Sequence, residues 1–332
     1  MTSLYPLFKE RGTGNGFFKL LELSTGLRFI PFACGRSAMV SGLKALGLQR
    51  TDEILVPPFL GQCVLSALSR AVFPAMSPSG RSRAILVYHQ FGFPQDIRAI
   101  ESYAHDKNLT ILNDCANTLF SCTNGNSLLE WGDFTIISLS KLYSCGLGGG
   151  LYSRRKDIYE NILDDHRELS DGQRERADLA LETLIKINSG VYGAETVYEI
   201  NGLYGYLPDV AAFPEKSHYG LPSTEEELHD DITHRKNIWS IVSNLFPDRV
   251  PECENIEVIP FAIPIFGDPE KLKVISNKIR NELSLDVPVL HFDFARNMLN
   301  PDYRQSLVIG CHDGWDEGLV VKICEIIKGH IK

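Results

Sequence analysis

The chain has 332 residues, which leaves room for one large domain of about 200–250 residues with a smaller one, or for two ordinary domains. Its composition, 44% hydrophobic and 23% charged, is that of a globular protein and excludes a wholly disordered chain. The formal net charge of −9 argues against a nucleic-acid groove built from overall charge, and still allows a local cationic pocket for one phosphate.

The sequence shows no sign of membrane insertion or secretion. No apolar run approaches the roughly 20 residues that a membrane-spanning helix needs. Residues 1–6 lack the basic and apolar stretches of a signal peptide. We therefore expect a cytoplasmic protein with neither a membrane nor a nucleic acid as partner.

The cysteines indicate neither a disulfide framework nor a metal site. There are eight, at positions 34, 63, 115, 122, 145, 253, 311 and 324, and no two form a C-x-x-C pair. Scattered cysteines in a chain of this length are expected to be reduced and mostly buried. Nothing has the spacing of zinc ligands, so we expect no metal.

Segments of strand and helix type alternate through the first half of the chain. The expected helices are 37–46, 62–71 and 94–107, and the expected strands are 54–56, 84–88, 109–112 and 134–137. The strands are almost continuously apolar, as in a parallel sheet covered on both faces. This alternation predicts an α/β fold with a large, doubly wound and mainly parallel sheet.

The pattern changes after Arg154. Helices are expected at 156–166, 171–187 and 223–245, followed by a strand at 256–265, a helix at 269–283, strands at 287–292 and 306–311, and a helix at 315–331. The last part is a small α+β unit. Because residues 202–222 are rich in Gly, Tyr and Pro, we place the joint there and predict a large α/β domain over 1–210 and a small C-terminal α+β domain over 211–332.

Ligands of open parallel sheets bind beyond the carboxyl ends of the strands, and one candidate is the glycine turn at 34–38. Gly35 opens a helix there, and a helix N-terminus offers free N–H groups and a positive dipole end to a phosphate. Arg36 and the Ser37 hydroxyl would add donors. The alternative is that Ser37 only caps the helix.

A second candidate is Asp114, at the end of the apolar strand 109–112. A carboxylate there is costly to bury unless a cation meets it. The alternative is that Asp114 caps a following helix.

The third candidate is Lys141, which follows the strand 134–137 and lies between serines, among them Ser138, and the glycine-rich turn 146–150. Burial would lower the pKa of such a lysine and make its amine a nucleophile for a carbonyl. The glycines would allow a ligand to approach the backbone closely.

Together, the three sites are the parts needed to hold pyridoxal phosphate: a lysine for the Schiff base, an acid for the pyridinium nitrogen and a helix start for the phosphate. In these parts the chain resembles the StrS/DegT-type sugar aminotransferases, of the fold-type-I pyridoxal-phosphate class. The matching segments are 35–39 (family pattern G-[ST]-[SA]-A-L), 52–59 (D-E-V-I-V-P-S-F), 91–96 (Y-G-Q-P-x-D), 113–117 (E-D-A-A-Q) and 132–150 (G-D…K-x-x-x-x-G-x-G-G). The C-terminal part adds His291 and residues 316–327.

The chain departs from the family pattern at several places. Gly61 stands where an aromatic ring normally stacks on the pyridine, and either Phe59 or Tyr88 could replace that ring. Asn117 replaces the usual Gln. The G-Y-N-[YF]-R stretch, through which the neighbouring subunit contacts the phosphate, is missing apart from a trace at 205–206.

The resemblance implies a fold-type-I enzyme with pyridoxal 5'-phosphate as cofactor, Lys141 and Asp114 as catalytic residues, and a homodimer. Residues 192–206 are a candidate interface segment because they are rich in Tyr and Gly, and aromatic residues are enriched at interfaces. The cofactor-binding residues that the resemblance implies are Gly35, Arg36, Ser37, Phe59, Asp114, Asn117, Ser138 and Lys141. The implied reaction is transfer of an amino group from a small donor to a keto-sugar nucleotide or related carbonyl compound, as in sugar nucleotide biosynthesis. A pyridoxal-phosphate lyase or dehydratase and a catalytically silent relative remain as alternatives.

Overall fold

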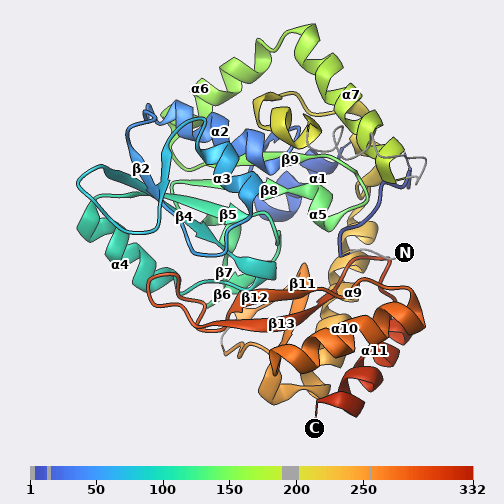
Figure 1. The fold of residues 1–332 in the computed structure, drawn as a ribbon. Helices are drawn as coiled ribbons and strands as arrows, with labels where there is room; N and C mark the ends of the chain where they lie inside the picture. Colours follow the sequence, from blue (N-terminus) through green and yellow to red (C-terminus); the bar gives the residue numbers. More distant parts are fainter. Residues whose placement is uncertain (1–3, 13–15, 189–201, 255, 332) are drawn as a thin grey trace.

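The computed structural model describes residues 4–12, 16–188, 202–254 and 256–331. Its largest element is a seven-stranded sheet (Figure 1). In spatial order, its strands are β1 (Ile30–Phe32), β9 (Gly149–Ser153), β8 (Phe134–Ser138), β5 (Thr110–Cys115), β4 (Ser82–Tyr88), β2 (Glu53–Leu55) and β3 (Phe73–Ala75).

The strands β8, β5, β4, β2 and β3 are parallel to one another, which confirms the predicted mainly parallel α/β sheet. The exception is β9, which is antiparallel to both β8 and β1. The sequence indicates only a glycine turn at 146–150, whereas in the structure the end of this segment begins β9. The chain returns along β8 without a crossover helix because antiparallel neighbours need only a short connection.

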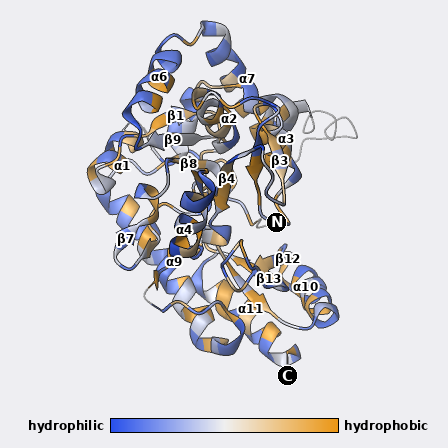
Figure 2. Cartoon of the chain, turned by 90° about the vertical axis from the view of Figure 1, so that its left-hand side faces the viewer, coloured by the Kyte–Doolittle hydropathy of each residue, from blue (hydrophilic) through white to orange (hydrophobic). Residues whose placement is uncertain are grey.

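Helices cover both faces of this sheet. On one face α2 (Gly35–Ala45), α3 (Gln62–Leu68) and α6 (Lys156–Arg167) pack on the strands, and on the other lie α1 (Phe17–Thr25) and α4 (Ile97–Lys107). Gly42 lets α2 approach closely, because a Cβ there would lie 2.6 Å from the Phe134 ring. Figure 2 shows hydrophobic residues concentrated on the strands and hydrophilic ones on the outer sides of the helices.

The helix boundaries differ slightly from the predicted ones. Helix α4 begins at Ile97 instead of Pro94, because the Asp96 side chain caps it by accepting from Ala99 N at 3.2 Å. Helix α7 (Asp171–Asn188) and helix α9 (Glu225–Leu245) match the predicted segments closely.

The C-terminal part forms its own layer of helices on a sheet. Strands β11 (Ala262–Phe266), β13 (Tyr303–Gly310) and β12 (Val289–Asp293) form an antiparallel sheet, against which α10 (Pro269–Leu283), α11 (Glu317–His330) and one side of α9 pack. The predicted strand 256–265 is wrong as a single element. Its first residues form β10 (Ile256–Glu257), which pairs with β6 (Cys122–Thr123), itself paired with β7 (Asn126–Ser127).

Figure 1 shows this C-terminal layer beside the large sheet, with α9 running along the junction. The domain division at residue 210 stays a prediction. No helix in the described part of the chain is both long and apolar enough to span a membrane.

Candidate active site

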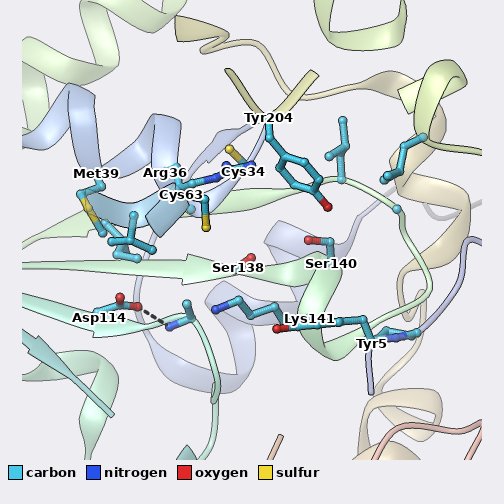
Figure 3. A pocket seen from close by; sticks show the side chains of 18 of the residues that line it. Tyr5, Cys34, Arg36, Met39, Cys63, Asp114, Ser138, Ser140, Lys141 and Tyr204 are labelled. Atoms are coloured by element: carbon cyan, nitrogen blue, oxygen red, sulfur yellow. Dashed lines mark hydrogen bonds between the residues drawn. The ribbon is translucent and has the colours of Figure 1, made fainter. Parts of the chain in front are cut away.

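The predicted acid and lysine come together because β5 and β8 are adjacent and parallel, with Asp114 paired to Ile136 in register. Asp114 lies near the end of β5, and Lys141 lies in α5 (Leu139–Leu142), a single turn that directly follows β8. Both side chains line one cavity of about 450 Å³. Figure 3 shows them pointing toward each other across it.

Burial shifts the pKa of both groups toward the neutral form. Asp114 is 3% exposed, and burial raises its pKa, while the charge of Lys141 and the hydrogen bond from Ala116 N counteract that rise. Burial lowers the pKa of Lys141, and the charge of Asp114 counteracts this. The cavity therefore favours an unprotonated, nucleophilic amine, and a carboxyl group that a cationic ligand would stabilise as the anion.

The structure contradicts the interpretation of Asp114 as a helix cap. No helix begins among the described residues immediately after β5, and the carboxylate accepts from Ala116 N at 2.9 Å within a turn. Its place in the cavity therefore needs another explanation.

The start of α2 forms another wall of the cavity, which both Gly35 and Arg36 line. It sits directly against β9: a Cβ on Gly149 would lie 2.4 Å from Gly35 N, so only glycine fits there. The Arg36 guanidinium lies 4.9 Å from the Tyr204 ring centroid, and its buried Nη1 has no hydrogen-bond partner. A buried cationic donor without an acceptor, beside a helix N-terminus, is suited to bind an anion.

Ser138 also lines the cavity, together with Ser140. Three other predicted residues, Ser37, Phe59 and Asn117, do not line the cavity. The Ser37 hydroxyl donates to Cys34 O at 2.8 Å and accepts from Cys34 N at 3.2 Å, so it caps α2. This corresponds to the alternative interpretation of the glycine turn.

Phe59 and Asn117 lie outside the cavity wall. Phe59 is 60% exposed and stacks on His291 with a centroid distance of 4.2 Å. Asn117 is buried and accepts from Tyr88 Oη and from Phe91 N. Of the two rings considered for stacking, Tyr88 is the one near the lysine, with its centroid 5.8 Å from Lys141 Nζ.

Several residues of the wall have no counterpart among the predicted site residues. Cys63 on α3, Tyr5 near the N-terminus and Tyr204 all line the cavity, as Figure 3 shows. Tyr204 belongs to the Tyr- and Gly-rich stretch that we interpreted as interface, but Tyr5 and Cys63 carry no signal in the sequence. Residues 192–201 of the candidate interface segment lie outside the described residues.

The described walls of the cavity carry the Lys141 amine, the Asp114 carboxylate and the Arg36 guanidinium, whose buried Nη1 has no hydrogen-bond partner. Such a set can hold a ligand that carries an electrophilic carbon, a basic nitrogen and an anionic group. Among the residues described, no cluster of three or more His, Cys, Asp or Glu side chains could hold a metal ion.

Comparison with known proteins gives a consistent result. A family model described as "Putative PLP-dependent aminotransferase" matches residues 23–179. The UDP-N-acetyl-3-dehydro-alpha-D-glucosamine 3-aminotransferase of Acidithiobacillus ferrooxidans is 29% identical over 138 residues, which cover 35% of this chain and 37% of that protein. The L-glutamine:2-deoxy-scyllo-inosose aminotransferase of Streptomyces fradiae is 27% identical over 43% of this chain and 39% of that protein.

The matches thus span about two fifths of the length of these curated relatives. Over the whole fold, the chain is similar to the crystal structure of a DegT DnrJ EryC1 StrS aminotransferase from Brucella abortus, with a TM-score of 0.63 and 15% identity over 97% of this chain and 92% of that one. This likeness confirms the fold-type-I architecture. In sequence the chain is thus similar to sugar aminotransferases, and in fold to an aminotransferase of the DegT/StrS type, in line with the resemblance seen in the motifs.

Proposed function

We propose that the protein is a pyridoxal-phosphate-dependent aminotransferase that acts on a keto-sugar nucleotide or related small carbonyl compound. The observation that supports this most is the pairing of Lys141 and Asp114 in one buried cavity, across from the start of α2. Pyridoxal phosphate, when bound, supplies an aldehyde and a protonated ring that accepts electrons from a neighbouring carbon.

The residues fit the cofactor in three ways. Lys141 provides the buried amine to which the aldehyde would attach, and burial lowers the pKa of that amine, which favours its neutral, nucleophilic form. Asp114 would hold the ring N–H and keep that nitrogen protonated. Arg36, whose buried Nη1 has no other partner, would bind the phosphate with the N–H groups at the start of α2 and with Ser138.

During the reaction, this chain would contribute one proton carrier. With the cofactor bound, the Lys141 amine would act as the general base that takes a proton from the substrate carbon and as the general acid that gives it up again. The apolar packing around the cavity would keep water from competing for that proton. In this proposal Ser37 and Asn117 support α2 and Tyr88, respectively, without touching the cofactor.

The proposed substrate class rests on the relatives. One is named for a UDP-linked keto-sugar and another for a cyclic ketone with glutamine as amino donor. We extend to this chain their shared chemistry, a small amino donor and a cyclic carbonyl acceptor. The predicted cytoplasmic location is compatible with such substrates and stays a prediction.

A homodimer is also part of the proposal. Tyr204 lines the cavity and is 45% exposed, so a neighbouring subunit could close the cavity there. Sedimentation of the holoenzyme at micromolar concentration should give a dimer, and a monomer with cofactor bound would contradict the assembly.

The amino-transfer half-reaction tests the proposed function. The holoenzyme is mixed with glutamate or glutamine, and conversion of bound pyridoxal phosphate to pyridoxamine phosphate is followed by absorbance and mass spectrometry. We expect conversion with at least one amino donor, and a Lys141→Ala variant as control should give none. Cofactor binding without conversion by any donor would favour the lyase or the silent relative.

A further inference from the structure

An ion pair on α9 lies buried beneath the lysine turn. The Arg235 side chain is 2% exposed and that of Asp231, one helical turn earlier, 9%. Arg235 Nε donates to Asp231 Oδ2 at 2.9 Å, and its Nη2 donates to Oδ1 at 3.1 Å. A buried ion pair of this kind contributes little net stability compared with apolar residues of the same volume, so its presence calls for another reason.

The remaining donors of Arg235 reach two other segments. Nη2 donates to Leu142 O at 2.6 Å, and Nη1 donates to Pro260 O at 3.2 Å. Leu142 is the last residue of α5 and the neighbour of Lys141. Pro260 lies just before β11, in the segment that leads into the C-terminal sheet.

The contact with Leu142 matters because α5 is a single turn. The last carbonyls of a helix have no partner within it, and a cation at that end is favourable. The start of the turn is held by Leu139 N, which donates to Gly148 O at 2.9 Å, and Tyr143 N closes the turn on Leu139 O at 2.8 Å. Arg235 holds the opposite end, so the backbone of Lys141 is held from both sides.

We propose that Arg235 is a positioning residue: it fixes the carbonyl end of α5 and thereby aims Lys141 Nζ at Asp114. Through Pro260 the same guanidinium connects this turn to the C-terminal sheet. No other cationic side chain could replace it, because only a planar fork can serve one carboxylate and two carbonyls from separate segments at once. The orientation of Lys141 does not depend on the proposed function, but its importance for activity rests on the proposed aminotransferase reaction.

The test measures the amine of Lys141 directly. Full-length protein without added cofactor is methylated with formaldehyde and cyanoborohydride over a range of pH, and modification of Lys141 is followed by peptide mass spectrometry. Exposed Lys107 serves as internal control in every sample. In parallel, each protein is incubated with pyridoxal phosphate and reduced with borohydride.

Three variants separate positioning from stability. Asp231→Leu combined with Arg235→Met replaces the pair by apolar residues, which should preserve folding. Arg235→Lys keeps the charge beside Asp231 and loses the fork. Asp231→Asn weakens the pair but leaves both carbonyl contacts in place, and is the matched control.

We expect the double variant and Arg235→Lys to change the labelling rate of Lys141 at fixed pH by about threefold or more, equivalent to about half a pH unit in its midpoint. Asp231→Asn and the Lys107 control should follow the wild type. A wild-type Lys141 profile in the double variant, or in Arg235→Lys if the double variant does not fold, would overturn the proposal. If wild-type Lys141 captures no pyridoxal phosphate while the labelling shift is present, the proposed function fails and the positioning role stands.

Discussion

Replacing Asp114 by Asn is the substitution for which the structure predicts the clearest effect. Asn keeps the side-chain volume and an oxygen that can accept the hydrogen bond from Ala116 N, so the turn after β5 should survive. What it loses is the negative charge that, in the proposed function, would stabilise the protonated ring nitrogen of pyridoxal phosphate. The cofactor should still bind and attach to Lys141, but its ring should accept electrons poorly.

The size of the effect follows from burial. Asp114 is only 3% exposed, so a charge in contact with it interacts through an effective dielectric constant of about 20 and not through that of water. At a separation of about 4 Å this interaction amounts to about 4 kcal/mol. If most of it is lost in the transition state, the rate of amino transfer falls about 1,000-fold.

Single-turnover absorbance with glutamate or glutamine measures that rate in the wild type and in Asp114→Asn. A melting temperature within a few degrees of the wild type provides the control for folding. Comparable rates in the two proteins would refute the assignment, because they would leave Asp114 with no more than its hydrogen bond in the turn.

Three further predictions concern stability and cofactor binding. Burial of the ammonium group lowers the pKa of Lys141, so the stability that this group contributes is lost as the pH falls through its folded pKa. Lys141→Met should therefore raise the melting temperature of the cofactor-free protein at pH 7. A fall of several degrees would argue against the burial. In equilibrium dialysis, Arg36→Gln should weaken binding of pyridoxal phosphate about 10- to 100-fold, whereas Arg98→Gln, at an exposed position, should not. Ser37→Ala should lower the free energy of unfolding by about 1 kcal/mol without a comparable loss of affinity. Burial lowers the pKa of His89 to about 4, so protonation of this side chain favours the unfolded chain. Between pH 6.5 and 4 the unfolding free energy of the wild type should fall by about 3 kcal/mol more than that of His89→Gln. The same pH dependence in both proteins, measured by urea denaturation, would contradict this.

The parts of the site predicted from sequence are those set by sheet topology. Apolar strands followed by Asp114 and Lys141 indicate parallel neighbours, and the ends of such strands necessarily meet at one edge of the sheet. The glycine turn was recognisable from Gly35, which begins α2, whereas the short strand β1 before it was not predicted.

Side-chain direction at a turn was not predictable from the same pattern. The Ser37 hydroxyl could form hydrogen bonds either with a ligand or with the backbone at the start of its own helix, and in the structure it bonds to the backbone of Cys34. Phe59 adopts a positive φ of 59° and turns its ring toward His291, a residue far along the chain. Local sequence contains neither fact.

The other residues that could not be predicted from the sequence take part in contacts between distant segments. Tyr5, Cys63 and Tyr204 meet in the cavity only after the chain has folded. Arg235 stands in a charged helix that resembles an exposed one, yet it is 1% exposed because α9 lies in the junction between the two sheets. The burial of a charge against distant carbonyls leaves no periodic signal in the sequence.

The central claim is that Lys141 carries the cofactor, and borohydride reduction tests it most directly. The protein is incubated with pyridoxal phosphate, reduced and digested, and the modified peptide is identified by mass spectrometry. The account predicts a single pyridoxyl group on Lys141, which is lost in Lys141→Ala. A pyridoxyl group on another lysine, or no modification at all, would contradict it.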